Sequence, residues 1–115
     1  MKYFDKDEFA CKCGCGSNSI SSDLIEALDE ARGIAEVPFK ITSGYRCEKH
    51  PESLSNPTSS HIKGLAADIA ISDSGRRSQI LRAVIAAGFH RIGISNGFIH
   101  VDIDPGKSAN VIWTY

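Results

Sequence analysis

Two residues that can bind a metal ion, His61 and Asp68, lie seven positions apart in the segment SSHIKGLAADI, which spans 59–69. Asp68 falls within an apolar stretch, AADIAI. A carboxylate among apolar residues is costly to bury unless it is paired or bound to a metal. A glycine and two alanines between the two residues leave room around an ion. The segment therefore predicts two ligands of a metal site.

A third potential ligand, His100, lies in the segment FIHVDI. Alternate residues of a strand face opposite sides, so His100 and Asp102 share one face and the isoleucines and valine form the other. We expect the aliphatic face to join the core and the face with His100 to line a cleft. Two histidines and one aspartate form a ligand set suited to catalytic zinc, with a fourth position left for water. The sequence thus predicts one Zn2+ ion bound by His61, Asp68 and His100.

The elements that must position these residues follow from apolar periodicity and turn signals. The predicted elements in chain order are a helix over 22–35, a strand over 39–44, a strand that begins near 66, a helix over 74–88, and two strands over 90–95 and 97–103. The Asn-Gly pair at 96–97 is a strong hairpin signal. Residues 1–20 are expected to form an irregular arm, and 47–60 a polar loop. The predicted fold class is therefore α+β, with two main helices and a small, mostly antiparallel sheet.

The bulk composition describes an ordinary globular domain. A chain of 115 residues, 42% hydrophobic and 23% charged, predicts one domain over 1–115. The net charge of -1 provides no basic field for nucleic acid. No apolar run reaches the roughly 18–20 residues of a transmembrane helix, and the N-terminus has charges where a signal peptide needs an apolar core. We expect a monomer made in the cytoplasm, with a separate release route to any target outside it.

The four cysteines, Cys11, Cys13, Cys15 and Cys47, leave three interpretations open. They can be free or structural thiols, a disulfide can involve Cys47, or they can form a small second metal site. The run CKCGCG differs from a zinc ribbon, because one residue separates its cysteines where ribbons usually have two.

Several segments together resemble one known family. The residues Ser59, His61, Gly64, Ala66 and Asp68 match the pattern SxHxxGxAxD, preceded by TSGYRC and followed by GFIHVDI. This combination resembles the zinc D-Ala-D-Ala carboxypeptidases and dipeptidases, family fifteen of the metallopeptidases, whose fold the hedgehog signalling domain shares. The resemblance runs from about residue 4 to 105. The arm FDKDEFACKCGCG is similar to that of short phage and prophage members.

The resemblance implies roles for individual residues. It makes His61, Asp68 and His100 the zinc ligands, and Arg46 a residue that binds substrate or stabilises charge on the scissile carbonyl oxygen. Ser59 is expected beside the metal, where it bonds substrate or fixes the loop. The implied reaction is hydrolysis of amide bonds in peptidoglycan stem peptides, as a carboxypeptidase or endopeptidase. A phage or prophage lysis enzyme of this kind would reach the wall through a holin-like pore.

The general base of the family pattern is missing. Many members have Glu or Asp three residues before the last zinc histidine, and related enzymes have His two before it; here these positions are Gly97 and Phe98. Asp102 could replace the base, or it could instead accept a hydrogen bond from His100 and fix its tautomer. His90, on the neighbouring predicted strand, is another candidate base. The alternative function is a zinc-stabilised peptide-binding or structural phage module without efficient catalysis.

Overall fold

The computed structural model describes residues 2–115, which form three α-helices, one short 3-10 helix and a five-stranded mixed sheet. The elements in chain order are η1 (Lys6–Phe9), α1 (Ser22–Ala35), β1 (Ile41–Ser43), α2 (Pro51–Ser55), β2 (Ala66–Ala70), α3 (Ser74–Ala86), β3 (Arg91–Ile94), β4 (Phe98–Asp102) and β5 (Val111–Thr114). Among the described residues, no helix combines the length and the apolar character needed to cross a bilayer. The α+β prediction is confirmed.

The strand order is β1-β2-β4-β3-β5, and the first four strands pair antiparallel. β5 is the exception, since it pairs parallel to β3. The hairpin predicted at 96–97 connects β3 and β4, with the Ser95 N–H donating to the Phe98 carbonyl at 3.0 Å. In the centre of the sheet, β2 and β4 place Asp68 directly opposite His100.

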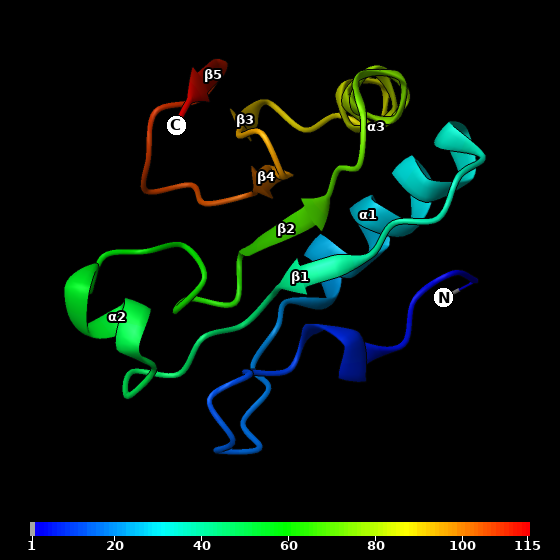
Figure 1. Ribbon diagram of the computed structural model, residues 1–115. Helices are drawn as coiled ribbons and strands as arrows, with labels where there is room; N and C mark the ends of the chain where they lie inside the picture. The colour runs from blue at the N-terminus through cyan, green and yellow to red at the C-terminus, as the bar shows by residue number, and fades with distance from the viewer. Residues whose placement is uncertain (1) are drawn as a thin grey trace.

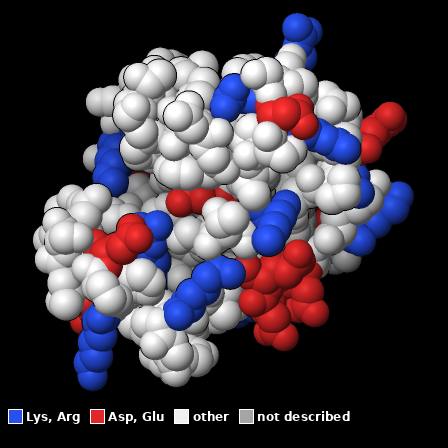
Figure 2. Space-filling model, in the orientation of Figure 1, with Lys and Arg blue, Asp and Glu red and all other residues white. Residues whose placement is uncertain are grey.

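The core lies between one face of the sheet and the helices α1 and α3, which pack against each other (Figure 1). Leu24 and Leu28 of α1 are fully buried there, because helical spacing puts them on one face. Ile99 and Val101 of β4 are fully buried on the sheet side, as their alternation predicts. The opposite face of β4 is thereby left for polar side chains. On the surface seen in Figure 2, several acidic side chains gather in one patch at the lower right, and basic side chains are scattered over the rest of the face.

Three elements were not expected from the sequence: η1, α2 and β5. η1 lies in the arm that was predicted to be irregular, where Asp5 and Glu8 form a capping box at its start. α2 begins within the polar loop, where Pro51 stands at the first helical turn and His50 Nδ1 accepts a hydrogen bond from the Glu52 N–H at 3.1 Å. Proline at this position and an N-terminal cap favour even a short helix. β5 consists of four residues that favour strands, VIWT, and it is half-exposed at the sheet edge. Its strand conformation depends on pairing with β3.

Candidate functional site

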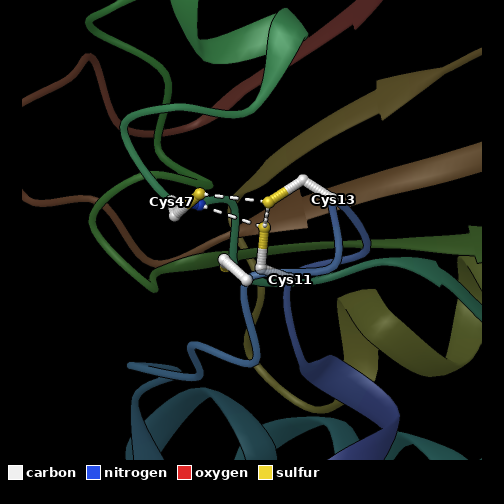
Figure 3. A group of neighbouring side chains, drawn as sticks. Cys11, Cys13 and Cys47 are labelled. Atoms are coloured by element: carbon white, nitrogen blue, oxygen red, sulfur yellow. Dashed lines mark hydrogen bonds between the residues drawn. The ribbon is translucent and has the colours of Figure 1, made fainter.

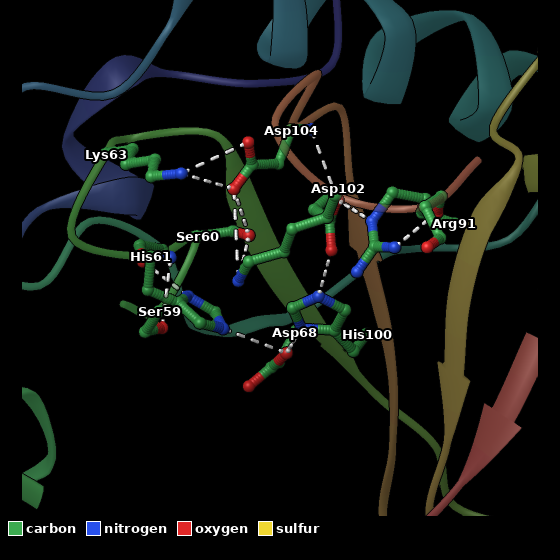
Figure 4. A network of polar contacts seen from close by, with 12 residues as sticks. Ser59, Ser60, His61, Lys63, Asp68, Arg91, His100, Asp102 and Asp104 are labelled. Atoms are coloured by element: carbon green, nitrogen blue, oxygen red, sulfur yellow. Dashed lines mark hydrogen bonds and ion pairs between the residues drawn. The ribbon is translucent and has the colours of Figure 1, made fainter. Parts of the chain in front are cut away.

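The three predicted ligand residues converge on the sheet face opposite the helices. His61, Asp68 and His100 are all buried, and one potential ligand atom from each lies within 4.8 Å of the others. Asp68 Oδ1 is 3.4 Å from His61 Nε2 and 3.0 Å from His100 Nδ1. Figure 4 shows these side chains turned toward one another. The strand pairing positions two of them, and the loop before β2 supplies the third.

Backbone packing fixes the position of that loop. Gly64 has φ 71, in the left-handed region, and a Cβ at this position would collide with the Ser19 carbonyl. The Gly64 carbonyl accepts a hydrogen bond of 2.8 Å from the Ser21 N–H. A glycine is therefore required for the loop to lie against the N-terminal arm, and this contact holds His61 over the sheet.

The second nitrogen of each histidine has its own acceptor. His61 Nδ1 lies 2.8 Å from the Gly44 carbonyl oxygen, and His100 Nε2 lies 2.7 Å from Asp102 Oδ2. With a metal ion bound, these nitrogens would donate and leave His61 Nε2 and His100 Nδ1 unprotonated toward the ion; without the ion, the same two atoms can donate to Asp68. Outer hydrogen bonds of this kind orient metal-binding histidines. Two imidazole nitrogens and one carboxylate oxygen fit zinc.

Charges inside the group stabilise one another. Burial alone raises the pKa of Asp68, but hydrogen bonds from His100 and His61 outweigh it and lower the pKa well below its usual range. Burial lowers the pKa of His100, whereas its hydrogen bonds to Asp102 and Asp68 produce a net increase. The carboxylate of Asp68 is therefore ionised at neutral pH, which is the form that a metal ion binds.

The comparison with known families agrees with this geometry. A family model described as Peptidase M15 matches residues 2–102. The chain belongs to the peptidase M15 family. This family is zinc-dependent, and membership implies hydrolytic chemistry on a peptide substrate. No individual curated protein matches the chain.

An open cavity of about 370 Å³ adjoins the candidate metal-binding group of the M15 domain, and His61, Asp68 and His100 line it. Its lining comprises Arg46, Glu52, Asn56, Ser59, Ser60, His61, Asp68, Arg91, Phe98, His100, Asp102, Lys107, Trp113 and Tyr115. The cavity is thus built from the loop before α2, α2 itself, the loop before β2, the sheet and the chain end. A peptide segment can enter it because one side is open to solvent.

Arg46, for which the resemblance predicts a substrate-binding role, lines the cavity. Its guanidinium is 3.7 Å from Asp68 Oδ2 and 3.5 Å from Glu52 Oε2, and its Nε donates to Ser43 Oγ at 3.1 Å. The side chain is 15% exposed, so most of its length is packed while the charged end lines the cavity. Ser59 also lines the cavity, and its Oγ accepts a hydrogen bond from the His61 N–H at 3.2 Å.

The two candidate bases from the sequence lie in different surroundings. Asp102 is 2% exposed; its Oδ2 faces His100, and its Oδ1 accepts from Arg91 Nε at 2.7 Å and from the Asp104 N–H at 3.2 Å. These bonds suit the alternative in which Asp102 fixes the His100 tautomer. His90 is exposed just before β3 and does not line the cavity.

Several cavity residues were missed by sequence reasoning. Glu52 enters from α2, and its side chain is 66% exposed. Trp113 enters from β5, with its ring centroid 5.4 Å from that of His100 and the Arg91 guanidinium 5.0 Å over its ring. The proline and histidine at the start of α2 were the available signal for Glu52. The run VIWT, made of residues that favour strands, was the available signal for Trp113, but the parallel pairing with β3 that brings Trp113 to the site is non-local.

Asp104 connects the two segments that contain the candidate histidine ligands. Its side chain is fully buried and accepts from Ser60 Oγ at 2.8 Å and from Lys63 Nζ at 3.0 Å, on both sides of His61. Its own N–H donates to Asp102, beside His100. Burial alone raises the pKa of Asp104, but the hydrogen bonds from Lys63, Ser60 and a backbone N–H lower it to about 2.

Replacing Asp104 with Asn should destabilise the domain by about 1–3 kcal/mol at pH 7, because a charged buried acceptor is lost. The pKa of this carboxyl is lower in the folded state than its unfolded value of about 3.9. The stabilisation that the Asp104 carboxylate contributes to the folded state is therefore complete above the unfolded pKa and is lost as the pH falls toward about 2. Urea unfolding of both proteins at several pH values should show the difference shrinking across this interval. The exposed Glu30→Gln serves as control, and a difference that stays constant with pH would contradict the assignment.

Proposed function

We propose that this M15 domain hydrolyses amide bonds in peptidoglycan stem peptides, with zinc bound by His61, Asp68 and His100. The observation that supports this most is the buried three-ligand group at the base of an open cavity, with Arg46 beside Asp68. Zinc in such a site supplies Lewis-acid activation of water and of a carbonyl group. A phage or prophage lysis enzyme, released through a holin-like pore, is the biological setting that we propose.

The charges of the cavity suit a stem peptide. Such peptides contain D-glutamate and end in a carboxylate, so they bring anionic groups to the site. Arg46 and Lys107 line the cavity as cations, and Lys107 Nζ lies 3.0 Å from Ser60 Oγ. A guanidinium is always charged and binds a carboxylate or a carbonyl oxygen with two donors. Arg46 therefore orients the substrate and stabilises negative charge on the scissile carbonyl oxygen.

Glu52 is the general base in our proposal. A base must reach the cavity and keep an oxygen free to accept a proton from the attacking water. The carboxylates that line the cavity are Glu52, Asp68 and Asp102. Asp68 faces both histidines, and each oxygen of Asp102 accepts a hydrogen bond. Glu52 is largely exposed and has one ion pair with Arg46, at 3.5 Å.

Incubation of the zinc-loaded protein with purified murein tests the function. We expect mass spectrometry of the soluble fraction to show released products: free D-alanine from a carboxypeptidase, or stem-peptide fragments from an endopeptidase. Protein depleted of metal by a chelator is the control and should release neither. Intact murein after incubation with fully zinc-loaded protein would refute hydrolysis and favour the peptide-binding module.

A further inference from the structure

A second group of potential metal ligands lies far from the histidines along the chain. The four cysteines Cys11, Cys13, Cys15 and Cys47 place their Sγ atoms within 4.8 Å of one another, and all are free thiols. Cys13 Sγ is 3.5 Å from Cys11 Sγ and 3.3 Å from Cys47 Sγ. Figure 3 shows the sulfur atoms of Cys11, Cys13 and Cys47 turned toward one another.

These distances match a tetrahedral thiolate site. Zinc–sulfur bonds of about 2.3 Å separate the sulfur atoms of a regular tetrahedron by about 3.8 Å. The two separations of 3.3 and 3.5 Å are slightly shorter than this value, and all four Sγ atoms lie within 4.8 Å of one another. A disulfide would join only two of the four cysteines, whereas here all four converge.

The backbone around the cysteines supports the same geometry. The Cys47 N–H donates to Cys11 Sγ at 3.3 Å, and the Ser17 N–H donates to Cys15 Sγ at 3.4 Å. Hydrogen bonds from outer groups orient metal ligands and stabilise their charge. Gly14 and Gly16 have φ values of 92 and 74, which L side chains rarely adopt, and they permit the tight turns on either side of Cys15. Single-residue spacing can therefore form a site without the ribbon pattern.

We propose that Cys11, Cys13, Cys15 and Cys47 bind a second, structural zinc ion. Four thiolates leave no open coordination position, which is typical of structural and not of catalytic zinc. The ion would fasten the arm to the segment after β1, where the Phe9 carbonyl already accepts from the Tyr45 N–H at 2.8 Å. This segment contains Arg46, which directly precedes Cys47. The proposal does not depend on peptidase activity.

Metal analysis of protein purified with zinc and a reductant tests this proposal. We expect two zinc ions per chain in the wild type and one in Cys15→Ser. Because the Cys15 side chain is exposed, this variant should still fold. His61→Ala should also retain one ion, at the cysteines. Lys12→Ser, in the same turn but without a thiol, should retain two. One zinc per chain in the wild type, removed entirely by His61→Ala, would overturn the proposal.

Cobalt substitution gives an independent readout that needs no activity. Co2+ bound by four thiolates absorbs visible light intensely, and Co2+ bound by two histidines and one aspartate does so weakly. The intense absorption should appear in the wild type and in His61→Ala and disappear in Cys15→Ser. Its absence from the wild type would refute the cysteine site, while murein hydrolysis could still be observed. The protein can also be denatured without reduction and treated with an alkylating reagent. Labelling of only two of the four cysteines would refute the cysteine zinc site and indicate a disulfide.

Discussion

Replacing His61 with alanine should remove the zinc of the three-ligand group and reduce murein hydrolysis to the level of chelator-treated wild type. Loss of an outer hydrogen-bond partner already weakens zinc binding by about 10–100-fold, so loss of a direct ligand should exceed this. Zinc content and product release measured on the same preparation check both effects. Circular dichroism should show the sheet retained, because the core lies on its opposite face.

His90→Ala is the matched control, since it removes an exposed histidine outside the cavity. It should retain both zinc and hydrolysis. Zinc at the wild-type level in His61→Ala would contradict the ligand assignment. Loss of hydrolysis with zinc intact in His90→Ala would instead make His90 the base.

The local pattern of β4 could be predicted from the sequence, because period-two alternation depends only on neighbouring residues. It places Ile99 in the core and His100 on the other face, as the structure shows. Asp68 was predicted near His100 by family resemblance and by its costly apolar surroundings. The register that puts them opposite each other results from antiparallel pairing of β2 and β4, which are separated by α3.

Interactions between distant segments could not be predicted. Small residues between His61 and Asp68 were interpreted as clearing space for the metal, but Gly64 is needed where the loop packs against Ser19 of the arm. The approach of Cys47 to the arm cysteines is likewise non-local, so three interpretations of the thiols remained open. The helix-start signal of His50 and Pro51 did not by itself mark Glu52 as a site residue, because a single exposed Glu in a polar loop is ordinary.

Replacing Glu52 with Gln should lower kcat on murein by about 10²–10⁴-fold while zinc content stays at the wild-type level, because a general base contributes this much. Glutamine has the same shape and cannot accept the proton. Glu52→Asp keeps the charge and should retain more activity than Glu52→Gln. The exposed Glu48→Gln controls for a charge change in the adjacent turn and should leave kcat unchanged.

Asp102→Asn distinguishes the two carboxylates, because we expect it to act through His100. It should weaken zinc binding about 10–100-fold, and excess zinc should restore much of the activity. Excess zinc should not restore activity to Glu52→Gln, because the zinc site of this variant is intact. Wild-type kcat in Glu52→Gln, together with a low kcat in fully zinc-loaded Asp102→Asn, would transfer the role of base to Asp102. The two variants thus separate a residue that moves a proton from one that positions a ligand.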